Sequence, residues 1–202
     1  MTEKLSYHAN LNGVSFRLFE LEQLLKFQDK GYSESRIRNE VLENNAFQND
    51  ALSLVDRMLP VMIERMKAFD FELRSIFLQG TINTKRILNL YAIMKTDLLF
   101  YEFMNEVIRK KFDNDNLYLE LKDVNVFFTE KSEQSEIVLN WSEATKEKLS
   151  ERYRHVLVES GILKSHKDRI LIPQIIDEEI RDYFITNGYK EYIYAMGDEG
   201  EL

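Results

Sequence analysis

The chain has 202 residues, contains no cysteine and carries a net charge of −8 at neutral pH. Its length allows one large domain or two small ones, and the lack of thiols excludes disulfides and thiolate chemistry. The negative total also argues against a protein that binds polyanions over its whole surface. With 44% apolar residues and only two prolines, the composition favours a mainly α-helical fold with a sizeable core.

The first part of the chain is predicted to form consecutive helices. Apolar residues recur at helical spacing over residues 13–30, and Gly31 is expected to end this helix. Ser33 is a predicted N-cap for a second helix that runs to about residue 44. Asn49 or Asp50 is expected to cap a third helix. Pro60 should interrupt or restart it, because proline is not tolerated in a helix interior.

After Pro60 the apolar residues alternate in steps of four and three, which predicts a helix whose seam packs in a bundle core. The seam consists of Met62, Met66, Phe69, Leu73 and Ile76. Gly80 is expected to end this helix. A further helix should start at Asn83 or Thr84, and Asp97 should cap another that runs to about residue 111. The polar residues 113–116 predict a break and a boundary between a helical bundle domain, residues 1–113, and a second domain, residues 114–202.

The second domain is predicted to contain a long helix followed by a β-hairpin. Residues 119–131 suit a helix or a strand equally well. Ser142 should cap the long helix, which ends near Ser160 before Gly161. Residues 162–163 and 169–172 fit two short strands around a basic turn of residues 164–168. Pro173 should begin a last helix, and the acidic tail GDEGEL is expected to fray.

No motif points to catalysis. The patterns G-x-x-x-x-G-K-[ST], G-x-G-x-x-G and H-E-x-x-H are absent, and the three histidines lack the spacing of metal ligands. Asp113 and Asp115 match only the first positions of a calcium loop. We therefore predict no catalytic residue, no metal and no cofactor. No targeting signal or apolar run of about 20 residues is present, which favours a cytoplasmic protein without membrane insertion.

The charge is distributed unevenly, and two segments are basic. Residues 57–111 carry +4 and residues 137–173 carry +2, whereas the segments around them are acidic. On the predicted long helix, Lys148, Arg152 and His155 form a basic row beside an acidic row of Glu143, Glu147 and Glu151. The basic row could follow one DNA backbone, because phosphate contacts give affinity without sequence information. The predicted DNA contacts are Ser142, Thr145, Lys148, Arg152, Lys164, Lys167 and Arg169.

Several stretches, taken in order, resemble the BrxA family of BREX phage-defence systems. They are YHANLNGVSFRLFELEQLLKFQDKGYSESRIRNEVLENNAFQ from residue 7, R-x-x-P-V-M-I-E-R-M from residue 57, FMNEVIRKKF from residue 103, and WSEATKEKL followed by VESGIL from residue 141. The resemblance covers roughly residues 7–186. The same family has also been labelled a putative inner-membrane protein family of unknown function, which the hydropathy argues against.

The resemblance implies a non-enzymatic, all-helical protein with a NusB-like bundle and a winged-helix-like part that binds double-stranded DNA. It implies action beside other BREX proteins, among them a methyltransferase and an ATPase. A protein-interaction scaffold is the alternative, in which acidic surfaces meet a basic partner and no nucleic acid is contacted. An enzyme that uses two carboxylates brought together by the fold is the third hypothesis.

Overall fold

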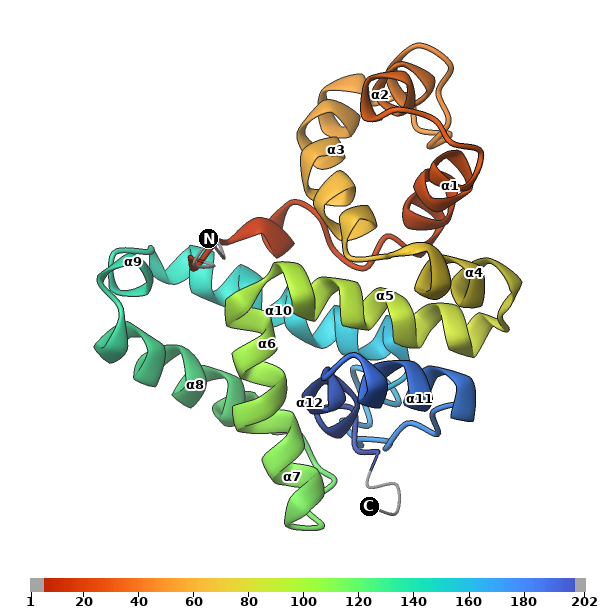
Figure 1. Cartoon of the computed structure of the whole chain (residues 1–202). Helices are drawn as coiled ribbons and strands as arrows, with labels where there is room; N and C mark the ends of the chain where they lie inside the picture. The colour runs from red at the N-terminus through yellow and green to blue at the C-terminus, as the bar shows by residue number, and fades with distance from the viewer. Residues whose placement is uncertain (1–5, 199–202) are drawn as a thin grey trace.

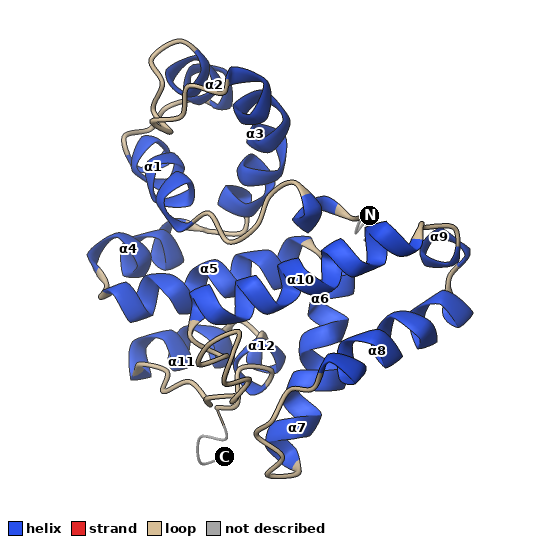
Figure 2. Ribbon diagram, turned by 180° about the vertical axis from the view of Figure 1, so that it is seen from behind, coloured by secondary structure: helices blue, strands red, loops and turns tan. Residues whose placement is uncertain are grey.

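The computed structural model describes residues 6–198, and helices dominate this part of the chain (Figure 2). After a short 3-10 turn, η1 (Asn10–Asn12), three helices gather on one side of the long helix α5 (Ile82–Thr96) (Figure 1). They are α1 (Leu18–Asp29), α2 (Glu34–Leu42) and α3 (Leu52–Lys67). The first helix thus starts five residues later than expected. The predicted Ser33 cap of α2 is confirmed, since its hydroxyl accepts the Arg36 N–H.

The predicted interruption at Pro60 is wrong, because α3 continues through it. Pro60 and Asp56 are both exposed, so water can satisfy the Asp56 carbonyl that loses its helical partner. The predicted cap at Asn49 or Asp50 is also wrong, since Ala51 precedes the first turn and no side chain caps it. Burial of the inner face of α3 outweighs both local defects.

The predicted seam is buried, but two helices carry it. Met62, Met66, Phe69, Leu73 and Ile76 are all at most 6% exposed. The helix is interrupted at residues 68–70. The next helix, α4 (Phe71–Gln79), begins after Asp70, whose carboxylate accepts the Leu73 N–H at 2.9 Å. The apolar residues keep their helical spacing across this interruption because the two helices turn their apolar faces toward the same core. The sequence signal missed was Asp70, a strong capping residue.

A helical path with a break at Asp97 leads from α5 into the second half of the chain. Thr81 caps α5 (Ile82–Thr96), and Asp97 caps α6 (Leu98–Phe103) as predicted, by accepting the Phe100 N–H. The π-helical η2 (Met104–Arg109) and α7 (Lys110–Asp113) complete the path, and the predicted break follows. The helix α8 (Leu121–Gln134) occupies the segment that the sequence left open between helix and strand.

The helices after the break at residues 113–116 pack against the helices before it. After α9 (Glu136–Leu139), α10 (Glu143–Ser160) lies beside α5 across the middle of the molecule (Figure 1). The expected last helix begins at α11 (Glu178–Thr186), five residues after Pro173, and is followed by α12 (Lys190–Tyr194). One continuous cluster of buried apolar residues extends from Leu11 to Met196.

Residues 117–119, 162–164 and 169–172 are joined by backbone hydrogen bonds. Tyr118 bridges Ile170, and Leu163 bridges Leu171, both in antiparallel fashion, so the last segment lies between the other two. These are isolated bridges, and the described residues include no longer strand.

The end of the described chain is held in place. Asp198 is 6% exposed and pairs with Arg181 at 2.7 Å, so the expected fraying does not include it. Residues 199–202 of the acidic tail lie outside the described part. Within residues 6–198, no helix combines the length and the apolar character needed to cross a bilayer.

Candidate nucleic-acid interface

The helix α10 and its N-cap residue carry four of the seven predicted contact residues. Its first turn is capped by Ser142, whose hydroxyl accepts the Thr145 N–H at 3.2 Å, and Gly161 ends it with a left-handed φ of 89°. Leu149, Tyr153 and Val156 are fully buried on its inner side. Lys148 is exposed, and Arg152 and His155 are half-buried along one edge, which we call the basic edge.

Most cations of the predicted set have no acidic partner. Among the described residues, no carboxylate lies within ion-pair distance of Lys148, Arg152, Lys167 or Arg169. Lys164 is the exception, because Asp168 lies 3.7 Å from its ammonium. Cations without carboxylate partners keep their field available for an external anion.

Residues 164–169 connect the two bridged segments, and we call these six residues the basic turn. The Ser165 hydroxyl accepts the Asp168 N–H at 2.9 Å, and the Arg169 N–H bonds the Ser165 carbonyl. Arg169 adopts a left-handed φ of 54°, a conformation that is more costly for arginine than for glycine or asparagine. The local turn geometry thus fixes the backbone from which Lys167 and Arg169 project.

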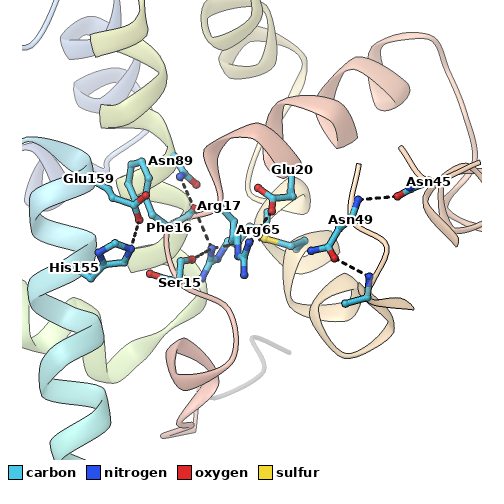
Figure 3. A network of polar contacts seen from close by, with 12 residues as sticks. Ser15, Phe16, Arg17, Glu20, Asn45, Asn49, Arg65, Asn89, His155 and Glu159 are labelled. Carbon is cyan, nitrogen blue, oxygen red and sulfur yellow. Dashed lines mark hydrogen bonds and ion pairs between the residues drawn. The ribbon is translucent and has the colours of Figure 1, made fainter. Parts of the chain in front are cut away.

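A pair of imidazoles joins the basic turn to α10. The rings of His155 and His166 stack with centroids 6.0 Å apart and an interplanar angle of 9°. His155 also lies 3.1 Å from the Glu159 carboxylate, as Figure 3 shows. Burial, then the neighbouring His155 and Arg154, lower the pKa of His166. The turn is therefore placed beside the end of the basic edge, a contact that no sequence spacing indicated.

Ser142 and Thr145 lie at the opposite end of α10 from the basic turn. Eighteen helical residues separate the two ends, which corresponds to roughly 27 Å. Both hydroxyls already take part in the cap, since they lie 2.9 Å from each other. The structure thus places Arg152 and the basic turn toward one end, and these two hydroxyls at the other.

The second basic segment, residues 57–111, has a different arrangement. Carboxylates lie close to Lys67, Arg74, Lys85, Arg109 and Lys111. Arg65 is 2% exposed and donates to the carbonyls of Val14 and Ser15 at 2.8 and 2.6 Å. Figure 3 shows how Arg65 lies beside Ser15. In this segment Arg65 is therefore buried, and five further cations are paired with carboxylates.

The acidic row of α10 borders a groove. Glu143 and Glu147 line a hollow of about 430 Å³ together with Asn125 and Thr129 of α8. Lys146 also lines it and pairs with Glu143 at 3.0 Å. The two long edges of α10 thus present opposite charge. Over residues 6–198 no three His, Asp or Glu side chains are arranged to hold a metal ion.

Comparison with known proteins supplies a family. The BrxA family model matches residues 5–188. A protein called BREX protein BrxA, from Bacillus cereus (strain H3081.97), is 31% identical over 198 residues, which are 98% of this chain and 95% of the relative. The crystal structure of an uncharacterized protein from Magnetospirillum magneticum is similar in fold, with a TM-score of 0.82. The two chains are 22% identical, and the match covers 94% of this chain and 97% of the other.

Proposed function

This chain belongs to the BrxA family, and on that premise we propose that it is a non-enzymatic accessory component of a BREX phage-defence system. In this role it binds double-stranded DNA, mostly through the phosphate backbone. It works in the cytoplasm beside other BREX proteins, among them a methyltransferase and an ATPase.

The observation that carries this proposal is the grouping of unpaired cations at α10 and the basic turn. The stack of His155 on His166 places Lys167 and Arg169 beside the helix that bears Lys148 and Arg152. None of these four cations has an ion-pair partner within the described residues. Phosphate contacts by lysine and arginine supply most of the affinity in non-specific DNA binding.

The order of elements supports a winged-helix-like arrangement for this part of the chain. The extended residues 117–119 are followed by α8 and α10, then by the bridged segments 162–164 and 169–172. The last segment lies between the other two, as the last strand does in a winged helix. The basic turn then corresponds to the wing, and α10 to the helix that approaches DNA.

The NusB-like character of the helices before residue 113, and a domain boundary at residues 113–114, are parts of the same proposal. The continuous core means that the two parts are closely packed. Such packing would let the helical bundle hold α10 in a fixed orientation on the duplex.

A salt-dependent titration tests the DNA proposal. The protein is titrated against a fluorescent duplex of about 30 base pairs and arbitrary sequence, at about 50 and about 200 mM salt. We expect micromolar or weaker binding that falls steeply between the two salt concentrations, because phosphate contacts release counterions. Absence of binding at the lower salt concentration would contradict the proposal.

The acidic groove favours a second candidate, a protein-interaction scaffold. Glu143 and Glu147 line a hollow to which a basic side chain of a partner is complementary. A pull-down with the neighbouring BREX gene products, in the presence of nuclease, separates the candidates. A partner retained after nuclease treatment, together with no duplex binding, would support the scaffold.

A further inference from the structure

Two histidines lie between cations of the proposed DNA contact. Arg152 comes one helical turn before His155 on the basic edge, and Lys167 directly follows His166 in the basic turn. The two imidazole rings stack with centroids 6.0 Å apart, so they occupy the junction between these cations. A DNA backbone that contacts both Arg152 and Lys167 therefore passes along the stack.

Both imidazoles are accessible from solvent. The His155 side chain is 41% exposed and His166 is exposed, whereas Tyr153 and Val156 on the inner side of α10 are fully buried. Within residues 6–198, no carboxylate lies within ion-pair distance of His166. The ring of His166 is therefore open to an anion from outside the protein.

The charges around the stack favour such an anion. Within four residues of either imidazole, cations outnumber acids by five to three. The cations are Arg152, Arg154, Lys164, Lys167 and Arg169, and the acids are Glu151, Glu159 and Asp168. Two of the acids are engaged, since Glu159 lies 3.1 Å from His155 (Figure 3) and Asp168 lies 3.7 Å from Lys164. A phosphate placed here would reduce the repulsion among the five cations.

The same surroundings oppose a positive charge on His166 in the free protein. Partial burial, followed by the neighbouring His155 and Arg154, lowers the pKa of His166 below its ordinary value of 6.5. A phosphate against the ring acts in the opposite direction, because a negative charge favours the imidazolium. Proton uptake by His166 and binding of the duplex should therefore strengthen each other, since coupling between two ligands is reciprocal.

We propose that His166 binds a phosphate of the duplex as an imidazolium, and that His155 positions it by stacking. The inference rests on the DNA binding proposed above and adds one contact residue and one positioning residue to it. In an imidazolium both ring nitrogens carry a hydrogen, so His166 donates to a phosphoryl oxygen through whichever nitrogen faces the duplex. The proton comes from the solvent when the phosphate arrives.

The test is a duplex titration of the full chain at pH 6, 7 and 8 and equal ionic strength, followed by fluorescence anisotropy. We expect the affinity to rise about three- to tenfold from pH 8 to pH 6, because the complex holds more protons than the free protein over this range. Affinity that is constant between pH 6 and pH 8 overturns the inference.

Two variants of His166 assign this pH dependence. His166→Gln cannot gain a charge, so its affinity at pH 6 should stay within about twofold of the native affinity at pH 8. His166→Lys is charged at every pH used, so its affinity should vary by less than about twofold and stay near the native value at pH 6. A His166→Gln variant with the native pH profile contradicts the assignment.

The third histidine of the chain provides the matched control. His8 lies in the N-terminal segment, whose Asn12 bonds the Thr145 carbonyl at the opposite end of α10 from the stack. His8→Gln removes one imidazole as His166→Gln does, and it should keep the native pH profile. A flat profile in His8→Gln would place the proton uptake outside the stack.

A measurement without DNA tests the role of His155. The pKa of His166 is followed by NMR of its ring proton in the free protein, and it should rise toward about 6.5 in His155→Gln because a neighbouring imidazole is removed. An unchanged pKa together with a native binding profile in His155→Gln removes His155 from the site. No duplex binding at any of the three pH values overturns the DNA proposal itself, whereas pH-independent binding overturns this inference alone.

Discussion

The two basic segments of this chain look alike in sequence and differ in structure. Residues 57–111 hold ten cations and six acids, and five of the cations have a carboxylate close by. Residues 137–173 hold seven cations and five acids, yet only Lys146 and Lys164 have such a partner within the described residues. Net charge along a segment therefore says little about the field that reaches a partner. In the first segment half of the cations are paired with carboxylates and Arg65 is buried, whereas in the second segment most cations have no carboxylate partner among the described residues.

The largest effect should come from the buried cation of the first segment. Arg65→Met leaves the carbonyls of Val14 and Ser15 without a donor, so we expect the free energy of unfolding to fall by about 3–5 kcal/mol. Urea denaturation followed by circular dichroism measures this loss. Arg57→Met, at an exposed position of the same helix, is the matched control and should change stability by less than about 0.5 kcal/mol. Equal losses in the free energy of unfolding in both variants would show that the buried hydrogen bonds of Arg65 contribute no particular stability.

The next effect concerns the free cations of the second segment. The triple variant Lys164→Ala, Lys167→Ala and Arg169→Ala should lower duplex affinity about 10- to 100-fold and reduce the salt dependence by about 0.9 per lost phosphate contact. Fluorescence anisotropy at several salt concentrations measures both quantities.

A second triple variant serves as its control. Lys67→Ala, Arg74→Ala and Lys85→Ala remove the same number of cations, but each of these pairs with a carboxylate. We expect duplex affinity to change by no more than about twofold. Similar losses in the two triple variants would mean that total charge, not its pairing, determines binding.

A smaller effect is expected from the buried acid of the first segment. Burial raises the pKa of Asp97 from 3.8 to about 6, so its ionisation increasingly opposes folding as the pH rises from about 4 to about 6. The penalty is absent below about pH 4, grows as the pH rises to 6, and is complete at pH 7. Asp97→Asn should thus stabilise the protein by about 1–2 kcal/mol at pH 7 and have little effect at pH 4. Parallel urea denaturation at both pH values measures the difference, and a pH-independent change would contradict it.

The smallest effect concerns the acidic row of α10. Glu147→Gln and Glu151→Gln together should raise duplex affinity about two- to fivefold at low salt, because two negative charges next to the basic edge are removed. The gain should vanish at high salt. Unchanged affinity would indicate that the duplex lies farther from α10 than proposed, on the side of the basic turn alone.

Much of the helical architecture could be predicted because its signals are local. Ser33, Asp97 and Ser142 cap helices as expected, and the apolar seam from Met62 to Ile76 is buried. Pro60 misled the prediction because the local cost of proline is outweighed by packing along α3. The late start of α11 was missed because the extended residues before it bond to distant backbone, as Gln174 does to Met196.

The contacts at the basic turn and around Arg65 depend on tertiary structure. No spacing rule places His155 next to His166, or Arg65 next to the carbonyls of Val14 and Ser15. Arg65 did leave a signal, since it lies on the same helical face as the buried Met62 and Met66. The pairing of Arg74 with Asp29 and of Lys85 with Glu22 could not be foreseen, because these partners on α1 are 45 and 63 residues away in the chain.

The last described residues also bear on how the end of α10 is held. The Gln174 side chain donates to the carbonyl of Gly161 at the end of α10, and its backbone N–H bonds the Met196 carbonyl. Support for α10 thus comes in part from residues that follow it by about 35 positions in the chain. A truncation before Met196 would remove the backbone contact of the residue that bonds the end of α10, although it would leave α10 itself intact.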